Sequence, residues 1–84
     1  FFGARGLTPR DGLMEADLDE AQLKHNLVRA SNTVIGIADS SKFGPRFLSA
    51  FALPDEVQRI ITDTQAPAAM VAELRTRGIQ VDLV

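Results

Sequence analysis

The stretch VIGIADSSKFGPRF, residues 34–47, decides the fold that the sequence predicts. It begins with an uninterrupted apolar run and continues into an acid, two hydroxyls and a lysine. Continuous apolar runs are typical of strands buried on both faces, as in parallel sheets. Ligands of parallel α/β proteins bind beyond the carboxyl ends of the strands. The polar residues are therefore candidates for a binding site, although polar residues also end strands and begin turns.

Around this strand the chain alternates between strand-like and helix-like segments. Strands are predicted at residues 33–38, 47–51, 58–63 and 79–84. Helices are predicted at residues 17–31 and 66–78, the first capped by Asp17 and the second stopped by Gly78. The first 13 residues read as the end of a strand and a glycine-rich loop with turn residues at 8–12. Such alternation predicts an α/β fold with a parallel sheet and right-handed crossovers.

Composition narrows the class of function. The chain has 84 residues, one domain at most, and its 45% apolar and 24% charged residues indicate a globular protein. A net charge of −2 gives no electrostatic case for binding a nucleic-acid backbone. With one histidine and no cysteine, we expect no metal and no cofactor. The apolar runs are far too short to span a membrane. Because the chain begins with Phe1 and closes on a strand, we expect a fragment of a longer protein.

The first predicted helix carries two charges, Glu20 and Lys24, within its apolar arc. On a helical wheel of about 100° per residue they fall between two apolar groups, one of which contains Leu23 and Leu27. His25 falls on the opposite, solvent-facing side. One interpretation is a helix salt bridge worth a few tenths of a kcal/mol, with Glu20 also serving the helix start. The other is that the arc faces a crevice and that the pair lines a polar site.

The residues after the central strand allow two similar interpretations. In the first, Asp39 caps a turn through Ser41 and Lys42 extends into water. In the second, Lys42 offers a cation, and Ser40 and Ser41 offer hydroxyls, to a polyol or a phosphate. The residues alone leave both interpretations open.

Taken together, these segments resemble the effector-sensing domain of the DeoR family of bacterial transcription regulators, which includes the glycerol-3-phosphate repressor. FFGARGLTPRDGL is similar to the family's F-L-G-A-x-G segment, and DEAQLKHNLVRAS to its E-x-x-x-K helix. VIGIADSSKFG is similar to its V-x-(V/L)-x-D-x-S-K-F-G hallmark, and IITD and LRTRGIQVDLV also match. The motifs D-S-S-K-F-G, E-x-x-x-K and I-T-D in this order are more specific than any one of them alone.

The resemblance implies a partial domain of the ribose-5-phosphate isomerase, glucosamine-6-phosphate deaminase and CoA-transferase fold type. Residues 1–84 would be the C-terminal part of a domain that senses a phosphorylated sugar or related metabolite. The whole protein would be a cytoplasmic, homo-oligomeric repressor of sugar catabolism and not an enzyme. It would bind DNA through an N-terminal winged helix-turn-helix that this chain does not contain.

The resemblance also implies a pocket at the carboxyl end of the central strand. In it, Lys24 and Lys42 contact phosphate or hydroxyl oxygens, and Glu20 holds Lys24 in place. Asp39 accepts from a sugar hydroxyl or orients Lys42. The loop Gly3–Gly6 approaches the ligand with its backbone. The expected ligand-binding residues are Gly3, Gly6, Glu20, Lys24, Asp39, Ser41 and Lys42.

Two other classes of function stay open. Isomerases of this fold type have an I-A-D-x-S-K segment similar to residues 37–42, and a gapless alignment there places their catalytic glutamate on Lys24. An ammonium binds an anion but does not serve as a carboxylate base, so an isomerase or deaminase would depend on Glu20. The third class is a dimerisation module without a ligand. Four phenylalanines expected at the surface would favour association: Phe1, Phe2, Phe47 and Phe51.

Overall fold

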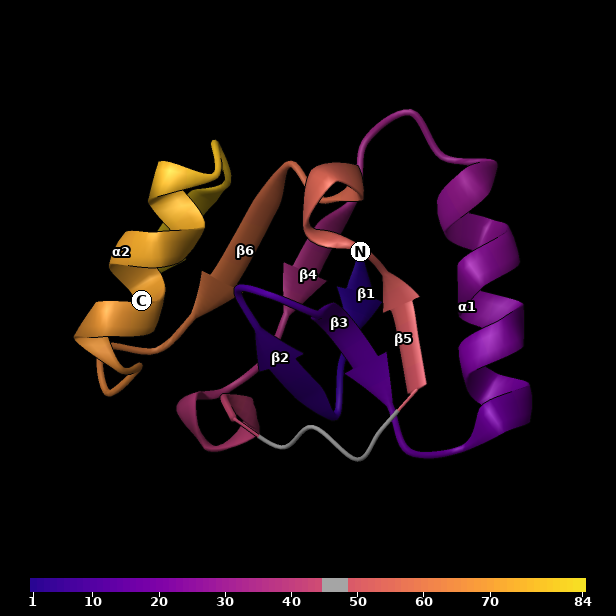
Figure 1. The fold of residues 1–84 in the computed structure, drawn as a ribbon, viewed down its shortest axis with the longest axis horizontal. Helices are drawn as coiled ribbons and strands as arrows, with labels where there is room; N and C mark the ends of the chain where they lie inside the picture. Colours follow the sequence, from indigo (N-terminus) through magenta and orange to yellow (C-terminus); the bar gives the residue numbers. More distant parts are fainter. Residues whose placement is uncertain (45–48) are drawn as a thin grey trace.

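Two sheets and two helices make up the computed structural model, which describes residues 1–44 and 49–84 (Figure 1). The strands are β1 (Phe2–Gly3), β2 (Gly6–Thr8), β3 (Gly12–Glu15), β4 (Ile35–Ile37), β5 (Ser49–Ala52), β6 (Arg59–Thr62) and β7 (Gln80–Leu83). The helices are α1 (Leu18–Arg29) and α2 (Ala68–Thr76), with short 3₁₀ turns at η1 (Ser40–Lys42) and η2 (Pro54–Glu56). In Figure 1 the two helices lie at opposite ends of the molecule.

The predicted parallel sheet is confirmed, with strand order β1-β4-β6-β7 and every pair parallel. A second, antiparallel sheet has the order β2-β3-β5. The two helices also form where the sequence predicts them. The strand expected at residues 47–51 corresponds to β5, and its first two residues, 47 and 48, lie outside the described part of the chain.

A β-hairpin stands where the sequence predicted a glycine-rich loop, so that prediction was wrong. Strands β2 and β3 pair on either side of a three-residue connection, with Thr8 opposite Gly12. The predicted turn at residues 8–12 is present: the Thr8 hydroxyl donates to Asp11 at 2.9 Å, and Gly12 has a φ of +83°. The two strands have only three and four residues, too few to show an alternating pattern among the glycines.

Helix α1 begins at the expected cap, because the Asp17 carboxylate accepts a hydrogen bond from the Glu20 backbone N–H at 3.1 Å. Its buried face agrees with the helical wheel only in part: the second apolar group of the wheel, Ala21 and Val28, is buried. Leu23 and Leu27 are 58% and 49% exposed, whereas His25 is half-buried, with Nδ1 3.4 Å from the Phe51 carbonyl oxygen. The reason is that the helix packs against β5 and β3 of the small sheet. None of the described helices is long and apolar enough to cross a membrane.

Phe51 is a core residue, and the expectation that it lies on the surface was wrong. Its side chain is 1% exposed, and its ring centroid lies 6.1 Å from that of the half-buried Phe2. Phe1 is 78% exposed, as expected, and Phe47 lies outside the described residues. Phe51 belongs to the core together with its neighbour Ala52, because the small sheet covers the core on one face.

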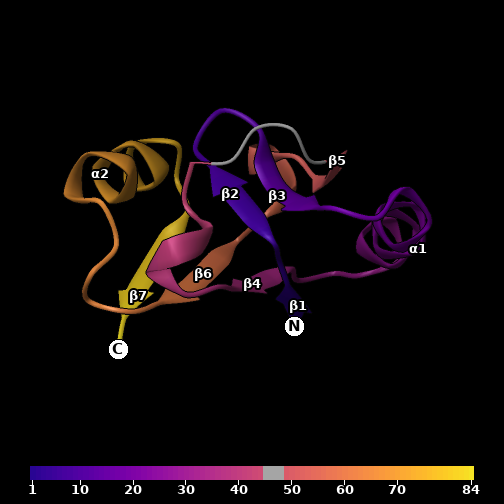
Figure 2. The same ribbon diagram turned by 90° about the horizontal axis from the view of Figure 1, so that it is seen from below.

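The parallel sheet is covered on one face only. Figure 2 shows α2 and the small sheet on one side of it, and no described helix or strand against the other. The covered face carries the paired residues Gly36, Ile60 and Val81, all buried. The open face carries Ile37, which is 43% exposed, and Ile61, but also the ion pair between Arg59 and Asp82. Parallel sheets are normally covered on both faces, so an open face of mixed apolar and charged residues is unusual for a parallel sheet.

Replacing Gly12 by alanine is expected to destabilise the fold by about 2 kcal/mol or more. A Cβ atom there would lie 2.0 Å from the Ala52 carbonyl oxygen, at a φ that side chains rarely adopt. Gly78→Ala is the matched control, because Gly78 also has a positive φ but faces open space. Urea denaturation measures both free energies of unfolding. Equal losses in the two variants would contradict this account of the hairpin.

Candidate functional site

Lys24 connects helix α1 to two strands. Its Nζ donates to the Gly3 carbonyl oxygen at 2.8 Å and to Glu15 Oε2 at 2.7 Å, and it lies 5.2 Å from the Phe51 ring centroid. The side chains of Lys24 and Glu15 are 20% and 9% exposed. Water thus reaches this pair only in small part. An ion pair shielded from water is stronger and more costly to break than an exposed one.

The expectation that Glu20 holds Lys24 was wrong. Glu20 is exposed, and within the described residues the carboxylate that pairs with Lys24 is that of Glu15. Glu15 lies at the end of β3, in the hairpin that the sequence did not predict. With that segment treated as a loop, nothing in the sequence could place Glu15 beside the helix.

Glu15 is held in its ionised form by its neighbours. Burial favours the neutral acid and acts to raise its pKa. The hydrogen bond from Lys24, a second from the Ala16 N–H, and the charges of Lys24 and Arg5 outweigh burial, so the pKa of Glu15 lies below its usual range. Arg5 Nε lies 3.9 Å from Glu15 Oε1. One carboxylate is therefore shared between two cations.

Asp39 caps the η1 turn and also faces its lysine. Its carboxylate accepts hydrogen bonds from the hydroxyl and the backbone N–H of Ser41, the latter at 2.8 Å. Lys42 Nζ lies 3.7 Å from Asp39 Oδ2. The two hydrogen bonds from Ser41, followed by the charge of Lys42, lower the pKa of Asp39. The capping interpretation is thus confirmed, and the same carboxylate is in place to orient Lys42.

Asp63, to which the sequence analysis gave no role, fixes the same turn to the neighbouring strand. One carboxylate oxygen accepts from the Ser40 N–H and the other from the Gln65 N–H, both at 2.8 Å. These two hydrogen bonds lower the pKa of Asp63. The signal that could have found it is the I-T-D motif, which puts an acid directly after a buried strand.

Beyond Lys42, the chain is tied to the hairpin. The Gly44 N–H donates to the Leu7 carbonyl oxygen at 3.1 Å, next to a parallel bridge between Leu7 and Phe43. Gly44 has a φ of +116°, a conformation that favours glycine. The turn that carries Lys42 is therefore anchored on both sides, to β6 and to β2.

A hollow of about 330 Å³ brings three of the expected residues together. It is lined by Gly3, Ala4, Arg5, Glu15, Lys24 and Lys42. Ala4 and Arg5 belong to the expected loop Gly3–Gly6, but the sequence analysis gave the Arg5 side chain no role, and it missed Glu15. Three cations and one carboxylate line the hollow, so its side chains favour an anionic ligand.

The other expected residues do not line this hollow. Gly6 is buried within β2, and Glu20 and Ser41 are exposed. Asp39 lines a separate hollow of about 220 Å³ at the carboxyl ends of β4 and β6, together with Asp63. A ligand confined to the cationic hollow would therefore not contact Asp39 directly. Asp39 would act on it only by orienting Lys42.

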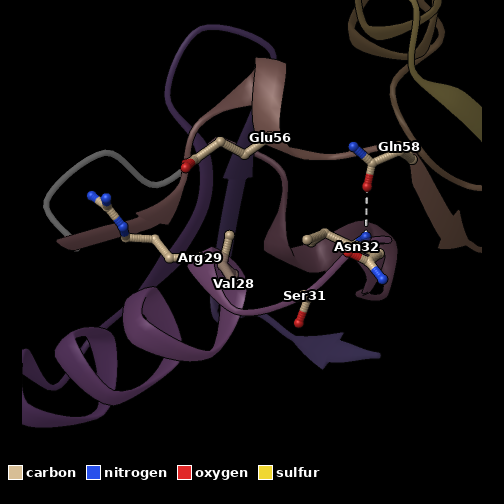
Figure 3. A pocket seen from close by; sticks show the side chains of 7 residues that line it. Val28, Arg29, Ser31, Asn32, Glu56 and Gln58 are labelled. Carbon is tan, nitrogen blue, oxygen red and sulfur yellow. Dashed lines mark hydrogen bonds between the residues drawn. The ribbon is translucent and has the colours of Figure 1, made fainter.

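A larger hollow of about 480 Å³ lies at the amino ends of β4 and β6, and Figure 3 shows the side chains that line it. Several of its polar side chains already form hydrogen bonds with the backbone. Gln58 Oε1 accepts from the Val34 N–H at 2.6 Å, Ser31 donates to the Leu27 carbonyl at 2.7 Å, and Glu56 accepts from a backbone N–H. Because these groups serve local structure, we place the candidate site in the smaller, cationic hollow.

The described residues contain no cluster of three histidine or acidic side chains that could hold a metal ion. The groups that line the candidate site offer charge and hydrogen bonding: two ammonium groups, a guanidinium, a carboxylate and the backbone around Gly3.

Comparison with known proteins identifies the family. Residues 1–64 match the family described as the DeoR C terminal sensor domain. The chain is 32% identical over 84 residues to the uncharacterized HTH-type transcriptional regulator YulB of Bacillus subtilis, covering all of this chain and 33% of that protein. It is 33% identical over 81 residues to the HTH-type transcriptional regulator GlpR of Haloferax volcanii, covering 96% of this chain and 32% of that protein.

The parallel sheet, the small antiparallel sheet and the two helices define an α/β domain. The chain belongs to the DeoR family of transcription regulators, as part of its C-terminal sensor domain. It spans about a third of the length of the curated relatives it matches.

Glu15→Gln is expected to destabilise the protein at pH 7 by about 3 kcal/mol, because it leaves Lys24 without its counterion. The pKa of Glu15 is lowered in the fold, so the ionised carboxylate contributes stability above the ordinary glutamate value of 4.5. That contribution is lost as the pH falls through the lower folded value.

The stability difference between wild type and Glu15→Gln should therefore shrink in acid, which denaturation at a series of pH values measures. Glu73→Gln is the control, because Glu73 forms an exposed pair with Arg77 and should cost less than about 0.5 kcal/mol. A difference that is independent of pH would contradict the role given to the Glu15 charge.

Proposed function

We propose that residues 1–84 form the C-terminal part of a domain that senses a phosphorylated sugar or related metabolite, and that the cationic hollow binds its phosphate. The observation that carries the proposal is that Lys24, Lys42 and Arg5 line one hollow. Three separate segments supply these cations, so their convergence does not follow from a single local motif. Phosphate is a common anionic group that such clusters bind.

Each cation of the site keeps capacity to bind a ligand. An ammonium has three N–H groups, and Lys24 uses two of them, for Gly3 and Glu15. Lys42 is 33% exposed and approaches Asp39 only to 3.7 Å. We assign direct contacts to these two lysines and to the Gly3 backbone, and positioning roles to Asp39 and Ser41. Glu20 and Gly6 lie away from the hollow and are not included.

For the whole protein, we propose a cytoplasmic repressor of sugar catabolism with the fold type of ribose-5-phosphate isomerase and its relatives. The relatives are named as HTH-type transcriptional regulators, which supports DNA binding through a segment outside this chain. Effector binding would then shift the population between conformations that do and do not bind DNA.

The rival function is that of a sugar-phosphate isomerase or deaminase. It needs a carboxylate base, and the carboxylate in the hollow is Glu15, not Glu20. Glu15 is ionised but bound to Lys24 at 2.7 Å, and a base held in this way has a lowered affinity for a proton. Saturable turnover of any pentose or hexose phosphate by the full-length protein would favour the enzyme and contradict the sensor.

A thermal-shift panel of sugar phosphates and glycerol phosphate tests the sensor directly. We expect one compound to raise the melting temperature of the full-length protein in a saturable way, because a ligand that binds only the folded state stabilises it. Lys42→Ala should remove that rise, and with it the response to the effector, while operator binding stays intact.

Arg77→Ala is the matched control, because Arg77 is an exposed cation that pairs with Glu73 and does not line the hollow. It should keep the full thermal shift. A Lys42→Ala variant that responds to the compound like wild type would contradict the assignment of the site.

We also propose that the protein is a homo-oligomer. The open face of the parallel sheet, which no described helix or strand covers and on which Ile37 is exposed, supports association through that surface. Sedimentation velocity at several concentrations should show a species larger than one chain. A monomer at every concentration would contradict this part of the proposal.

A further inference from the structure

We propose that Arg5 is a third anion-binding residue and that it makes the site prefer a doubly charged phosphate monoester to a singly charged anion. This inference rests on the function proposed for the hollow and adds to it the charge of the ligand. Arg5 precedes β2, whereas Lys24 belongs to α1 and Lys42 to η1. All three line the same hollow.

The backbone of Arg5 is fixed although its side chain is exposed. The Arg5 N–H donates to the Met14 carbonyl oxygen at 2.9 Å, which ties this residue to β3 of the hairpin. The side chain is 69% exposed, and its nearest charged partner is Glu15, 3.9 Å from Nε. The guanidinium therefore starts from a defined point on the rim of the hollow and has room to turn toward a ligand.

Arg5 is the least committed of the three cations. Lys24 is bound to Glu15 at 2.7 Å and to Gly3, and Lys42 lies opposite Asp39. The contact of Arg5 with Glu15 is longer than a hydrogen bond. A guanidinium has five N–H donors in a planar fork, which fits two oxygens of one phosphate group. Arg5 can thus bind the ligand without giving up a strong contact.

The charge preference follows from Coulomb's law. The electrostatic attraction between a fixed cation and a ligand is proportional to the charge of the ligand. Removing one cation therefore takes twice as much binding free energy from a dianion as from a monoanion. For a cation about 4 Å from the ligand in water, the dianion loses about fivefold more affinity than the monoanion, which is about 1 kcal/mol. Glu15 and Asp39 together offset two of the three positive charges, so Arg5→Gln removes the net positive charge of these five side chains.

Two small probes separate charge from shape. Methyl phosphate is a dianion at pH 8, whereas dimethyl phosphate carries a single charge. Their dissociation constants for the full-length protein can be measured by NMR titration at low ionic strength, where exposed charges are least screened. In wild type we expect methyl phosphate to bind more tightly. In Arg5→Gln we expect this preference to fall about fivefold.

Two further variants make the readout specific to charge. Arg5→Lys should keep most of the preference for methyl phosphate over dimethyl phosphate. The lysine retains the positive charge and loses only the planar set of guanidinium donors. Arg77→Gln, which removes an exposed cation outside the hollow, should leave the preference unchanged. Because the Arg5 side chain is exposed, Arg5→Gln should unfold at the wild-type urea midpoint, so that a lost preference reports on binding.

The outcomes distinguish this inference from the function on which it rests. If wild type binds methyl phosphate and Arg5→Gln weakens both probes equally or neither, Arg5 has no part in charge selection, although the hollow still binds phosphate. If wild type binds neither probe, both the inference and the proposed phosphate site are overturned.

Discussion

The contact of Lys24 with Gly3 and Glu15 is the interaction on which the arrangement of the site depends. It joins three elements: the helix α1, the end of the preceding strand β3, and the end of β1, which lies 21 residues before Lys24 in the sequence. Because the ion pair is largely shielded from water, it is costly to break, and it holds the ammonium at the wall of the hollow. The hairpin and the helix are thereby set at a fixed separation, and the cationic hollow lies between them and η1.

The second lysine is positioned by hydrogen bonds to the backbone. Asp39 closes the η1 turn from within, and Asp63 holds the same turn from the end of β6. Both carboxylates accept backbone N–H groups and have lowered pKa values, so they stay charged well into the acid range. The acids near this site therefore orient the cations and the turn, and the proposed contacts with a ligand fall to the cations.

The sequence predicted the parallel sheet, both helices and the importance of the turn after β4, because continuous apolar runs and cap residues are local signals. It did not predict the hairpin, whose strands are short and rich in glycine, and so it could not find Glu15 or Arg5. The helical wheel placed Lys24 near a site but paired it with Glu20, since a wheel shows neighbours on one helix only. Which face of α1 is buried depends on β5, a long-range contact that local periodicity does not contain.

An NMR titration of the isotopically labelled protein with glycerol phosphate tests the central claim most directly, since it locates the bound phosphate. The account predicts that the largest shifts fall on the backbone amides of residues 3–5, 15–16 and 40–42, which surround the cationic hollow. Shifts centred instead on residues 29–34 and 56–58, around the larger hollow of Figure 3, would contradict it.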